Sequence, residues 1–246
     1  MKFFADMHLC PPLEKADKTK EMIEKSAELG YDAVGITFPA GASLNEVQNV
    51  KDVCISIGVD LVTRTDLTPK NPASMLWDLR NLRRRFEIVA VRCFSKAVAR
   101  QAAKDRRVDL ISFPSTDVKR RFYDVAEAEL TSKALAGLEI DIASLLCLQG
   151  LQRSRLLSFL RREALMAGKF SVPLILSSGA NNVRFLRKPE DYMSLAYLFV
   201  SDPYVRKQAF SENPQNIIKR NRRKLSSNYV SQGVYVIRRG KDCPGA

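Results

Sequence analysis

Short apolar runs alternate with longer amphipathic stretches along the whole chain. Each run is rich in Val, Ile, Leu or Phe and is nearly apolar throughout, which is typical of parallel strands covered on both faces. The runs lie near residues 2–7, 33–38, 59–64, 87–94, 109–113, 137–142 and 174–178. The pattern therefore predicts seven parallel strands.

The stretches between these runs carry helix signals. In residues 16–29 the apolar side chains form one stripe, and Gly30 follows as a C-terminal glycine. Ser43 and Glu46 form a capping-box pattern that opens a second helix, and Pro72 suits the first turn of a third. We expect further helices over residues 95–104, 118–134, 151–167, 189–199 and 203–221.

The alternation of strands and helices at a spacing of roughly 25 residues favours βα units with right-handed crossovers. Seven units without a break in composition, and without a convincing eighth strand, predict an α/β fold. We expect a single TIM-barrel-like domain over residues 1–225, incomplete or distorted, in preference to an open doubly wound sheet. Residues 226–246 form a C-terminal extension that we expect to be partly disordered, although "GVYVIRR" within it has strand character.

The composition is that of a globular protein, with 246 residues, 46% hydrophobic and 27% charged. No apolar stretch approaches the roughly 18 residues of a membrane span, and the N-terminus lacks the features of a secretory signal, so we expect a cytoplasmic protein with no membrane partner. The five cysteines are far apart and form no C-x-x-C pair. This spacing predicts reduced, mostly buried thiols instead of disulfides or a structural zinc site.

Charge is the most informative bulk property. Forty Lys and Arg residues against 27 Asp and Glu give a formal net charge of +13. Such an excess suits a polyanion, in particular nucleic acid. The basic residues gather in short runs over residues 80–85, 104–107, 119–121 and 219–224. Any single run could equally be a solvated helix face.

In a βα barrel the functional side chains lie at the C-terminal ends of the strands. The first strand ends with Asp6 and His8, the only histidine of the chain, and the sixth carries Glu139 and Asp141. A hydrolytic centre with two or three metal ions needs several imidazole and carboxylate ligands that converge on one point. One histidine is too few, so we expect no catalytic metal and regard His8 as a packing residue.

Two arginines strengthen this interpretation. Arg64 and Arg92 stand at the ends of the third and fourth strands, where a metal site would need further ligands, and their charge repels a cation. A single carboxylate-bound Mg²⁺ near Asp6 and His8 stays open, because that ion needs few protein ligands. No nucleophile stands out either, unless folding brings His8 beside Cys10.

Several short motifs, taken in their order and spacing, resemble one known family. "FADMHL" (4–9) is similar to the opening of the polymerase and histidinol phosphatase superfamily, with Asp6 in place of the first histidine of an H-x-H motif. "LEIDIAS" (138–144), "SSGA" (177–180), "RKPEDYMSLAYLF" (187–199) and "NPQNIIKRN" (213–221) complete a resemblance to protein component 3 of archaeal and eukaryotic ribonuclease P. The resemblance covers about residues 1–225.

The resemblance implies a noncatalytic, RNA-binding barrel subunit of the endoribonuclease that removes 5′ leaders from precursor tRNA. The partners it implies are the ribonuclease P RNA, precursor tRNA through the complex, and a small ferredoxin-like protein subunit, component 2, in a heterotetramer. It implies no cofactor on this chain, with Mg²⁺ held by the RNA of the holoenzyme. Asp6, His8, Glu139 and Asp141 would then occupy vestigial metal-site positions.

We expect the RNA-binding side chains to come from loops that follow strands, because these loops meet at one rim of a barrel. Guanidinium groups suit phosphate because they pair two oxygens at once. The turn at "SSGA" either offers main-chain N–H groups to a phosphate or is simply a tight turn. The candidates are Arg64, Arg92, Lys96, Arg106, Arg107, Lys119, Arg120 and Arg184, with Ser178 and Gly179 in the turn.

Two other functions stay open from the residues. One is a metal-dependent phosphoesterase of the same superfamily with a reduced site at Asp6, His8, Glu139 and Asp141. The other is a barrel that binds a small anionic substrate between Arg64 and Arg92.

Overall fold

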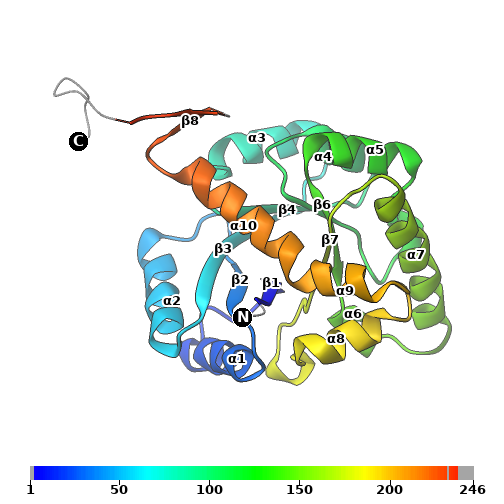
Figure 1. Cartoon of the computed structure of the whole chain (residues 1–246), viewed down its shortest axis with the longest axis horizontal. Helices are drawn as coiled ribbons and strands as arrows, with labels where there is room; N and C mark the ends of the chain where they lie inside the picture. Colours follow the sequence, from blue (N-terminus) through cyan, green and yellow to red (C-terminus); the bar gives the residue numbers. More distant parts are fainter. Residues whose placement is uncertain (1–2, 232, 238–246) are drawn as a thin grey trace.

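The computed structural model describes residues 3–231 and 233–237, and its core is one sheet of seven parallel strands. The strands pair in sequence order from β1 to β7, as Figure 1 shows. Their bounds are β1 Ala5–Leu9, β2 Ala33–Thr37, β3 Asp60–Leu67, β4 Ile88–Arg92, β5 Leu110–Ser112, β6 Gly137–Asp141 and β7 Leu174–Ser177. All seven predicted strands are confirmed.

Helices follow every strand and surround the sheet (Figure 1). The first group is α1 Ala16–Glu28, α2 Leu44–Ile57, α3 Pro72–Leu82, α4 Lys96–Lys104 and α5 Val125–Ala134. The second is α6 Ala143–Cys147, α7 Gly150–Lys169, α8 Pro189–Ala196, α9 Pro203–Phe210 and α10 Glu212–Leu225. Short 3₁₀ turns, η1 Val118–Arg120 and η2 Val183–Phe185, precede α5 and α8. The helix predicted over 118–134 is therefore split, and the one over 203–221 is two helices. None of the described helices combines the length and apolarity that crossing a bilayer requires.

The capping box predicted for α2 is present. The Ser43 hydroxyl accepts from the main-chain N–H of Glu46, and the Glu46 carboxylate accepts from the N–H of Ser43. Gly58 then ends α2 in the left-handed conformation.

The barrel closes between β1 and β7 only at the C-terminal end of the strands. There Leu9 and Ala180 form an isolated parallel bridge, and the N–H of Cys10 donates to the Ala180 carbonyl at 2.8 Å. At the other end α10 contacts both β1 and β7, and α9 contacts β7. Since the described residues hold no eighth strand in this sheet, the expected incomplete TIM-like barrel is confirmed.

The interior of the barrel has an apolar layer and a polar layer. Strand side chains such as Met7, Val62 and Ile175 form the apolar layer, and Ile217 and Ile218 of α10 pack against it from the N-terminal end. Strands β1 and β2 approach so closely here that position 35 needs a glycine. A Cβ on Gly35 would lie 2.4 Å from the Met7 carbonyl oxygen. The polar layer lies on the C-terminal side of the apolar layer. It opens at the C-terminal ends of the strands, which we call the barrel mouth.

Helix α10 lies across the N-terminal end of the barrel and is held there by polar contacts (Figure 1). The Arg222 guanidinium donates to both Asp60 oxygens at 2.6 and 2.9 Å, and the Asn221 amide donates to the Glu87 carbonyl at 2.8 Å. Arg220 pairs with Asp109 at 2.9 Å. Two of the five basic residues in the run 219–224, Arg220 and Arg222, therefore hold the helix against the barrel.

The C-terminal extension begins with a small hairpin of β8 Tyr229–Ser231 and β9 Val234–Tyr235, which projects from the barrel in Figure 1. The strand character of "GVYVIRR" is thus confirmed for Val234 and Tyr235. The disorder expected at the end of the chain concerns residues 238–246, which lie outside the described residues. Of the described cysteines, Cys54 and Cys93 are buried, Cys10 is half-buried and Cys147 is exposed, all as free thiols; Cys243 is outside the described part.

Candidate functional site at the barrel mouth

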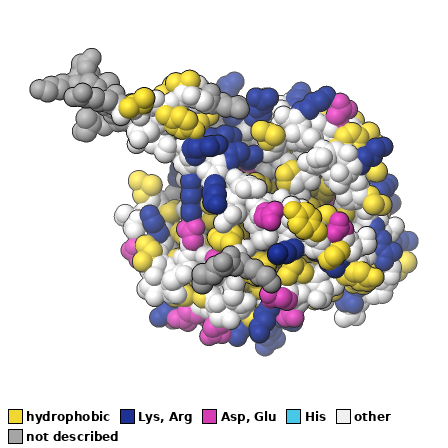
Figure 2. Space-filling view, in the orientation of Figure 1, with side chains coloured by type: hydrophobic (Ala, Val, Ile, Leu, Met, Phe, Trp, Pro, Cys, Tyr) yellow, Lys and Arg dark blue, Asp and Glu magenta, His cyan; other side chains and the backbone are white. Residues whose placement is uncertain are grey.

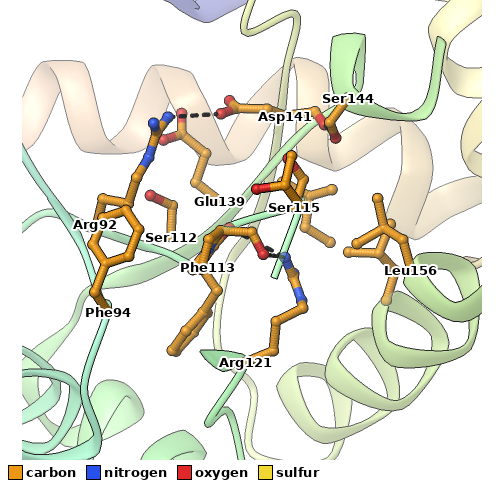
Figure 3. A pocket seen from close by; sticks show the side chains of 14 residues that line it. Arg92, Phe94, Ser112, Phe113, Ser115, Arg121, Glu139, Asp141, Ser144 and Leu156 are labelled. Atoms are coloured by element: carbon orange, nitrogen blue, oxygen red, sulfur yellow. Dashed lines mark hydrogen bonds and ion pairs between the residues drawn. The ribbon is translucent and has the colours of Figure 1, made fainter. Parts of the chain in front are cut away.

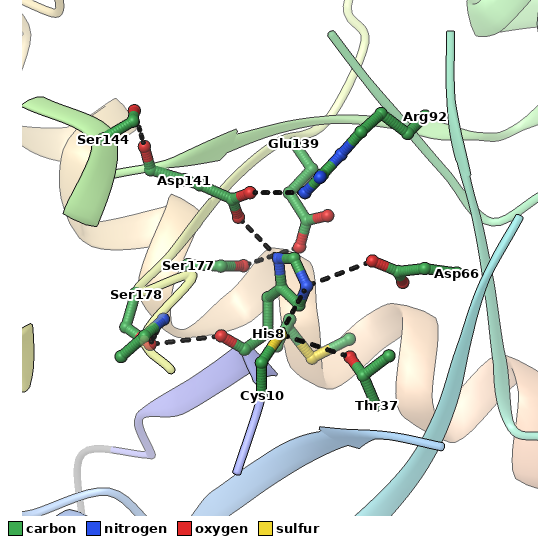
Figure 4. Close-up of polar contacts among 12 residues, drawn as sticks. His8, Cys10, Thr37, Asp66, Arg92, Glu139, Asp141, Ser144, Ser177 and Ser178 are labelled. Carbon is green, nitrogen blue, oxygen red and sulfur yellow. Dashed lines mark hydrogen bonds and ion pairs between the residues drawn. The ribbon is translucent and has the colours of Figure 1, made fainter. Parts of the chain in front are cut away.

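The carboxyl ends of β3, β4 and β6 bring charged side chains to one point (Figure 4). Residues two apart on a strand face the same side of the sheet. Arg64 and Asp66 therefore share one face of β3, and Glu139 and Asp141 share one face of β6. These faces line the upper end of the barrel interior.

Strand β1 contributes through an irregularity in its pairing. The register with β2 shifts between Asp6 and Leu9, and such shifts redirect side chains. Met7 consequently points into the apolar interior, and the next side chain, His8, lies in the mouth. The Asp6 carboxylate instead accepts main-chain N–H groups of Ser178 at 2.9 Å and His8 at 3.2 Å. The two residues that resemble half of a metal site therefore diverge.

The centre of the site is a buried ion pair between Arg64 and Glu139. The two Nη atoms donate to the two carboxylate oxygens, each at 2.6 Å, and Ser177 Oγ donates to Glu139 Oε1 at 2.7 Å. Arg64 also donates to Asp66 at 2.6 Å and to the Met7 carbonyl at 2.7 Å, and its side chain is fully buried. A buried guanidinium with these partners cannot contact RNA, so the prediction for Arg64 is wrong.

His8 lies between two carboxylates. Its Nδ1 is 2.7 Å from Asp141 Oδ1, and its Nε2 is 3.0 Å from Asp66 Oδ2. Burial and the Arg64 charge lower the pKa of His8, but the two carboxylates outweigh them, and the pKa lies well above its ordinary value. His8 is therefore an imidazolium at neutral pH. It neutralises both neighbours instead of packing as an uncharged ring.

Arg92 completes the group. Its side chain is 37% exposed, and Nη2 lies 3.5 Å from Asp141 Oδ2. Burial raises the pKa of Asp141, but the His8 charge and its hydrogen bond outweigh burial, so that the pKa lies below its ordinary value. Three cationic side chains thus face three carboxylates, and the mouth carries no excess charge.

The superfamily resemblance raises the question of whether these residues fit a metal. Ligand atoms of His8, Glu139 and Asp141 lie within 4.8 Å of one another. However, Arg64 binds both Glu139 oxygens, and carboxylates hold both nitrogens of the His8 ring. An ion would have to displace fixed cations from their partners. The residues therefore do not fit a hydrolytic metal cluster.

Folding does bring Cys10 beside His8, with Sγ 3.1 Å from Nε2. The same nitrogen faces Asp66, and the ring is protonated. Asp141 and Asp66 thus hold both ring nitrogens, so the ring has no free nitrogen with which to serve Cys10 as a general base.

The turn at "SSGA" is a tight turn and not a phosphate site. The N–H of Ser178 donates to Asp6, that of Gly179 to the His8 carbonyl, and that of Ala180 to Ser178 Oγ. Gly179 has φ +61°, and a Cβ there would lie 2.7 Å from the Cβ of Asp141. Because all three N–H groups are used inside the protein, the prediction that Ser178 and Gly179 bind RNA is wrong.

A cavity of about 220 Å³ adjoins the charged group (Figure 3). Its polar lining includes Arg92, Ser112, Ser115, Asp141 and Arg121. Arg121 is buried and donates to Glu163 at 2.8 Å, so Arg92 is the basic side chain that this cavity offers to solvent.

The remaining predicted RNA-binding residues fall into two groups. Lys96, Lys119, Arg120 and Arg184 are exposed on segments that follow strands, at the same end as the mouth. Arg106 and Arg107 follow α4 and precede β5, which places them at the opposite end of the barrel. The eight basic candidates therefore do not form one rim.

The sequence prediction missed Asp66, which joins Arg64 to His8, and Ser177, which supports Glu139. Spacing by two residues along β3 was a signal for Asp66, since it shares a face with Arg64. Nothing local announces Glu139 as the partner of Arg64, because 75 residues separate them.

The fold and the mouth together define a class of protein: a TIM-like α/β barrel whose mouth carboxylates pair with cationic side chains. In a metallohydrolase such carboxylates would bind metal ions instead. The chain belongs to the RNase P subunit p30 family, whose model matches residues 4–226. Within this family the chain resembles proteins named ribonuclease P protein component 3.

Two archaeal relatives match almost the whole chain. The component 3 protein of Methanosarcina mazei is 27% identical over 232 residues, covering 94% of this chain and 93% of its own length. That of Methanococcoides burtonii is 25% identical over 233 residues, covering 95% and 93%.

Solved structures show the same fold. A chain in a cryo-EM structure of archaeal ribonuclease P with mature tRNA aligns with a TM-score of 0.83 and 23% identity, covering 97% of this chain and all of that one. The crystal structure of an ochratoxinase from A. niger aligns with a TM-score of 0.58 and 10% identity, covering 88% of this chain and 71% of that one.

Proposed function

We propose that this chain is a noncatalytic RNA-binding subunit of ribonuclease P that supports removal of 5′ leaders from precursor tRNA. The observation that carries the proposal is the family match across residues 4–226. The formal net charge of +13 supports it, since polyanions are attracted to such a protein. We place the protein in the cytoplasm, where tRNA precursors would meet it.

The barrel mouth supports the noncatalytic part of the proposal. Phosphodiester hydrolysis by a protein of this kind would need activated water on a metal or a general base beside a nucleophile. Within the described residues the carboxylates of the mouth are bound to Arg64, Arg92 and His8, and the imidazole is already protonated. The Mg²⁺ ions for cleavage would then belong to the RNA.

The relatives suggest the partners. The M. mazei protein is named as a component of ribonuclease P, and the aligned cryo-EM particle contains mature tRNA. We accordingly assign this chain the ribonuclease P RNA as its main partner and precursor tRNA as a partner through the complex. A ferredoxin-like component 2, in a heterotetramer, completes the proposed assembly.

Reconstitution tests the proposal. Precursor-tRNA cleavage is measured over a range of Mg²⁺ concentrations with the cognate RNA alone, with component 2, and with component 2 plus this chain. We expect this chain to lower the Mg²⁺ concentration at half-maximal rate and to cleave nothing by itself. Cleavage of precursor tRNA by the isolated chain, or no change in Mg²⁺ dependence, would contradict the proposal.

A further inference from the structure

A second group of cations lies at the N-terminal end of the barrel, opposite the mouth. It consists of Arg83 after α3, Arg106 between α4 and β5, and Arg220 and Lys224 on α10, and we call these four residues the basic cluster. Arg220 and Lys224 are one turn apart and share a face of their helix. Figure 2 shows Lys and Arg side chains gathered over the C-terminal half of α10.

One carboxylate serves this cluster. Asp109 is fully buried, and its Oδ1 accepts from Arg220 at 2.9 Å and from Arg83 at 3.5 Å. The other acids beneath α10, Asp60 and Glu87, are paired with Arg222. Within the described residues Asp109 is thus the one acid paired with the basic cluster, and it pairs with two of the four cations.

Arg106 and Lys224 remain without an acidic partner. Within residues 3–231 and 233–237, neither side chain has a carboxylate oxygen within 4.0 Å. Burial lowers the pKa of Lys224, and the charges of Arg220, Arg83 and Arg106 lower it further against the opposing effect of Asp109. Like charges held together are unfavourable, so the fold maintains this arrangement at a cost in stability.

The cluster also has an open approach. Arg106 is exposed, and so are Arg84, two residues after the end of α3, and Arg223 on α10. Arg83 and Arg220 are fixed by main-chain carbonyls as well as by Asp109, so the cluster is held in place before any ligand arrives. A multivalent anion at this surface would relieve the repulsion without any rearrangement.

We propose that the basic cluster is a binding site for the sugar-phosphate backbone of RNA, with Arg106 and Lys224 as its phosphate ligands. Phosphate suits the site better than a protein carboxylate, since its charged oxygens can pair with a guanidinium and an ammonium at once. The main RNA-binding surface of the chain then lies at the N-terminal end of the barrel. This inference rests on the proposed function.

The test is the salt dependence of binding by the full chain, with in vitro transcribed ribonuclease P RNA of Methanosarcina mazei as the probe. Each phosphate contact contributes about 0.7–0.9 to the slope of log K against log salt concentration. In R106A/K224A we expect the slope to flatten by about 1.4–1.8. If the two chains bind equally at 1 M salt, the variant then binds the RNA roughly 25- to 60-fold more weakly than the unsubstituted chain at 0.1 M salt.

Two matched controls define the effect. K20A/K25A removes the same charge from the exposed surface of α1 and should leave the slope unchanged. R106K/K224R keeps both charges and should retain the slope. The thermal midpoint of R106A/K224A should be equal to or above that of the unsubstituted chain, because mutual repulsion has been removed; a structural role would lower it.

The outcomes separate the two proposals. An unchanged slope in R106A/K224A, or equal flattening in K20A/K25A, overturns the basic cluster and leaves the proposed function standing. A lower thermal midpoint in R106A/K224A also overturns it, because the two side chains would then be stabilising the fold. If the unsubstituted chain does not bind the RNA at low salt, both proposals fail.

Discussion

The two ends of the barrel use the same basic side chains in opposite ways. At the mouth, Arg64, Arg92 and His8 face three carboxylates, and the group is neutral and mostly buried. At the other end, in the part of the chain that the structure describes, Asp109 is the one carboxylate paired with the basic cluster, through Arg83 and Arg220. Neutralised cations stabilise a fold, whereas an excess of cations at a surface attracts a partner. The difference shows that the neighbours of an arginine, and not its place in a loop, decide what it does.

The largest effect should come from breaking the ion pair in the barrel. Arg64→Ala leaves Glu139 buried without its cation, and we expect a loss of about 3–5 kcal/mol in the free energy of unfolding, measured by urea denaturation. The double variant R64M/E139L, which removes both charges, should lose much less. A loss below about 1 kcal/mol for Arg64→Ala would contradict the structural role of the pair.

The pH dependence of stability should report the charge on His8. Because its pKa in the folded state is raised above 6.5, His8 stabilises the fold fully below pH 6.5, and this contribution is lost as the pH rises toward the folded pKa. One proton gives a slope of about 1.4 kcal/mol per pH unit across that window. We expect the difference between the unsubstituted chain and His8→Gln, measured by denaturation at a series of pH values, to shrink as the pH rises. A difference that is constant or grows would show that the ring is neutral.

A smaller effect should separate the two kinds of arginine on α10. Arg222→Ala removes the ion pairs with Asp60 and Glu87 and should cost about 1 kcal/mol, a value reduced by the partial exposure of these pairs. Arg223→Ala alters an exposed side chain and should stay within about 0.5 kcal/mol. Amide hydrogen exchange in α10 would detect the loosening in the first variant. Equal exchange rates in the two variants would mean that Arg222 does not fix the helix.

The apolar runs predicted the seven strands because parallel strands covered on both faces leave a strong local signal. The charged mouth depends on distant pairings, such as Arg64 with Glu139, and on a register shift in β1 that no local pattern announces. The position of Arg106 and Arg107 could have been predicted correctly. They follow a predicted helix and precede a predicted strand, so element order alone assigns them to the N-terminal end of the barrel.

The account depends most on the claim that side chains, and not metal ions, neutralise the carboxylates of the mouth. The direct measurement is the metal content of the purified full chain, by plasma mass spectrometry after equilibration with Mn²⁺ and Zn²⁺ and removal of free ions. We predict less than one ion per chain, both in the unsubstituted protein and in His8→Gln. Two or more tightly bound ions per chain that His8→Gln removes would contradict the account.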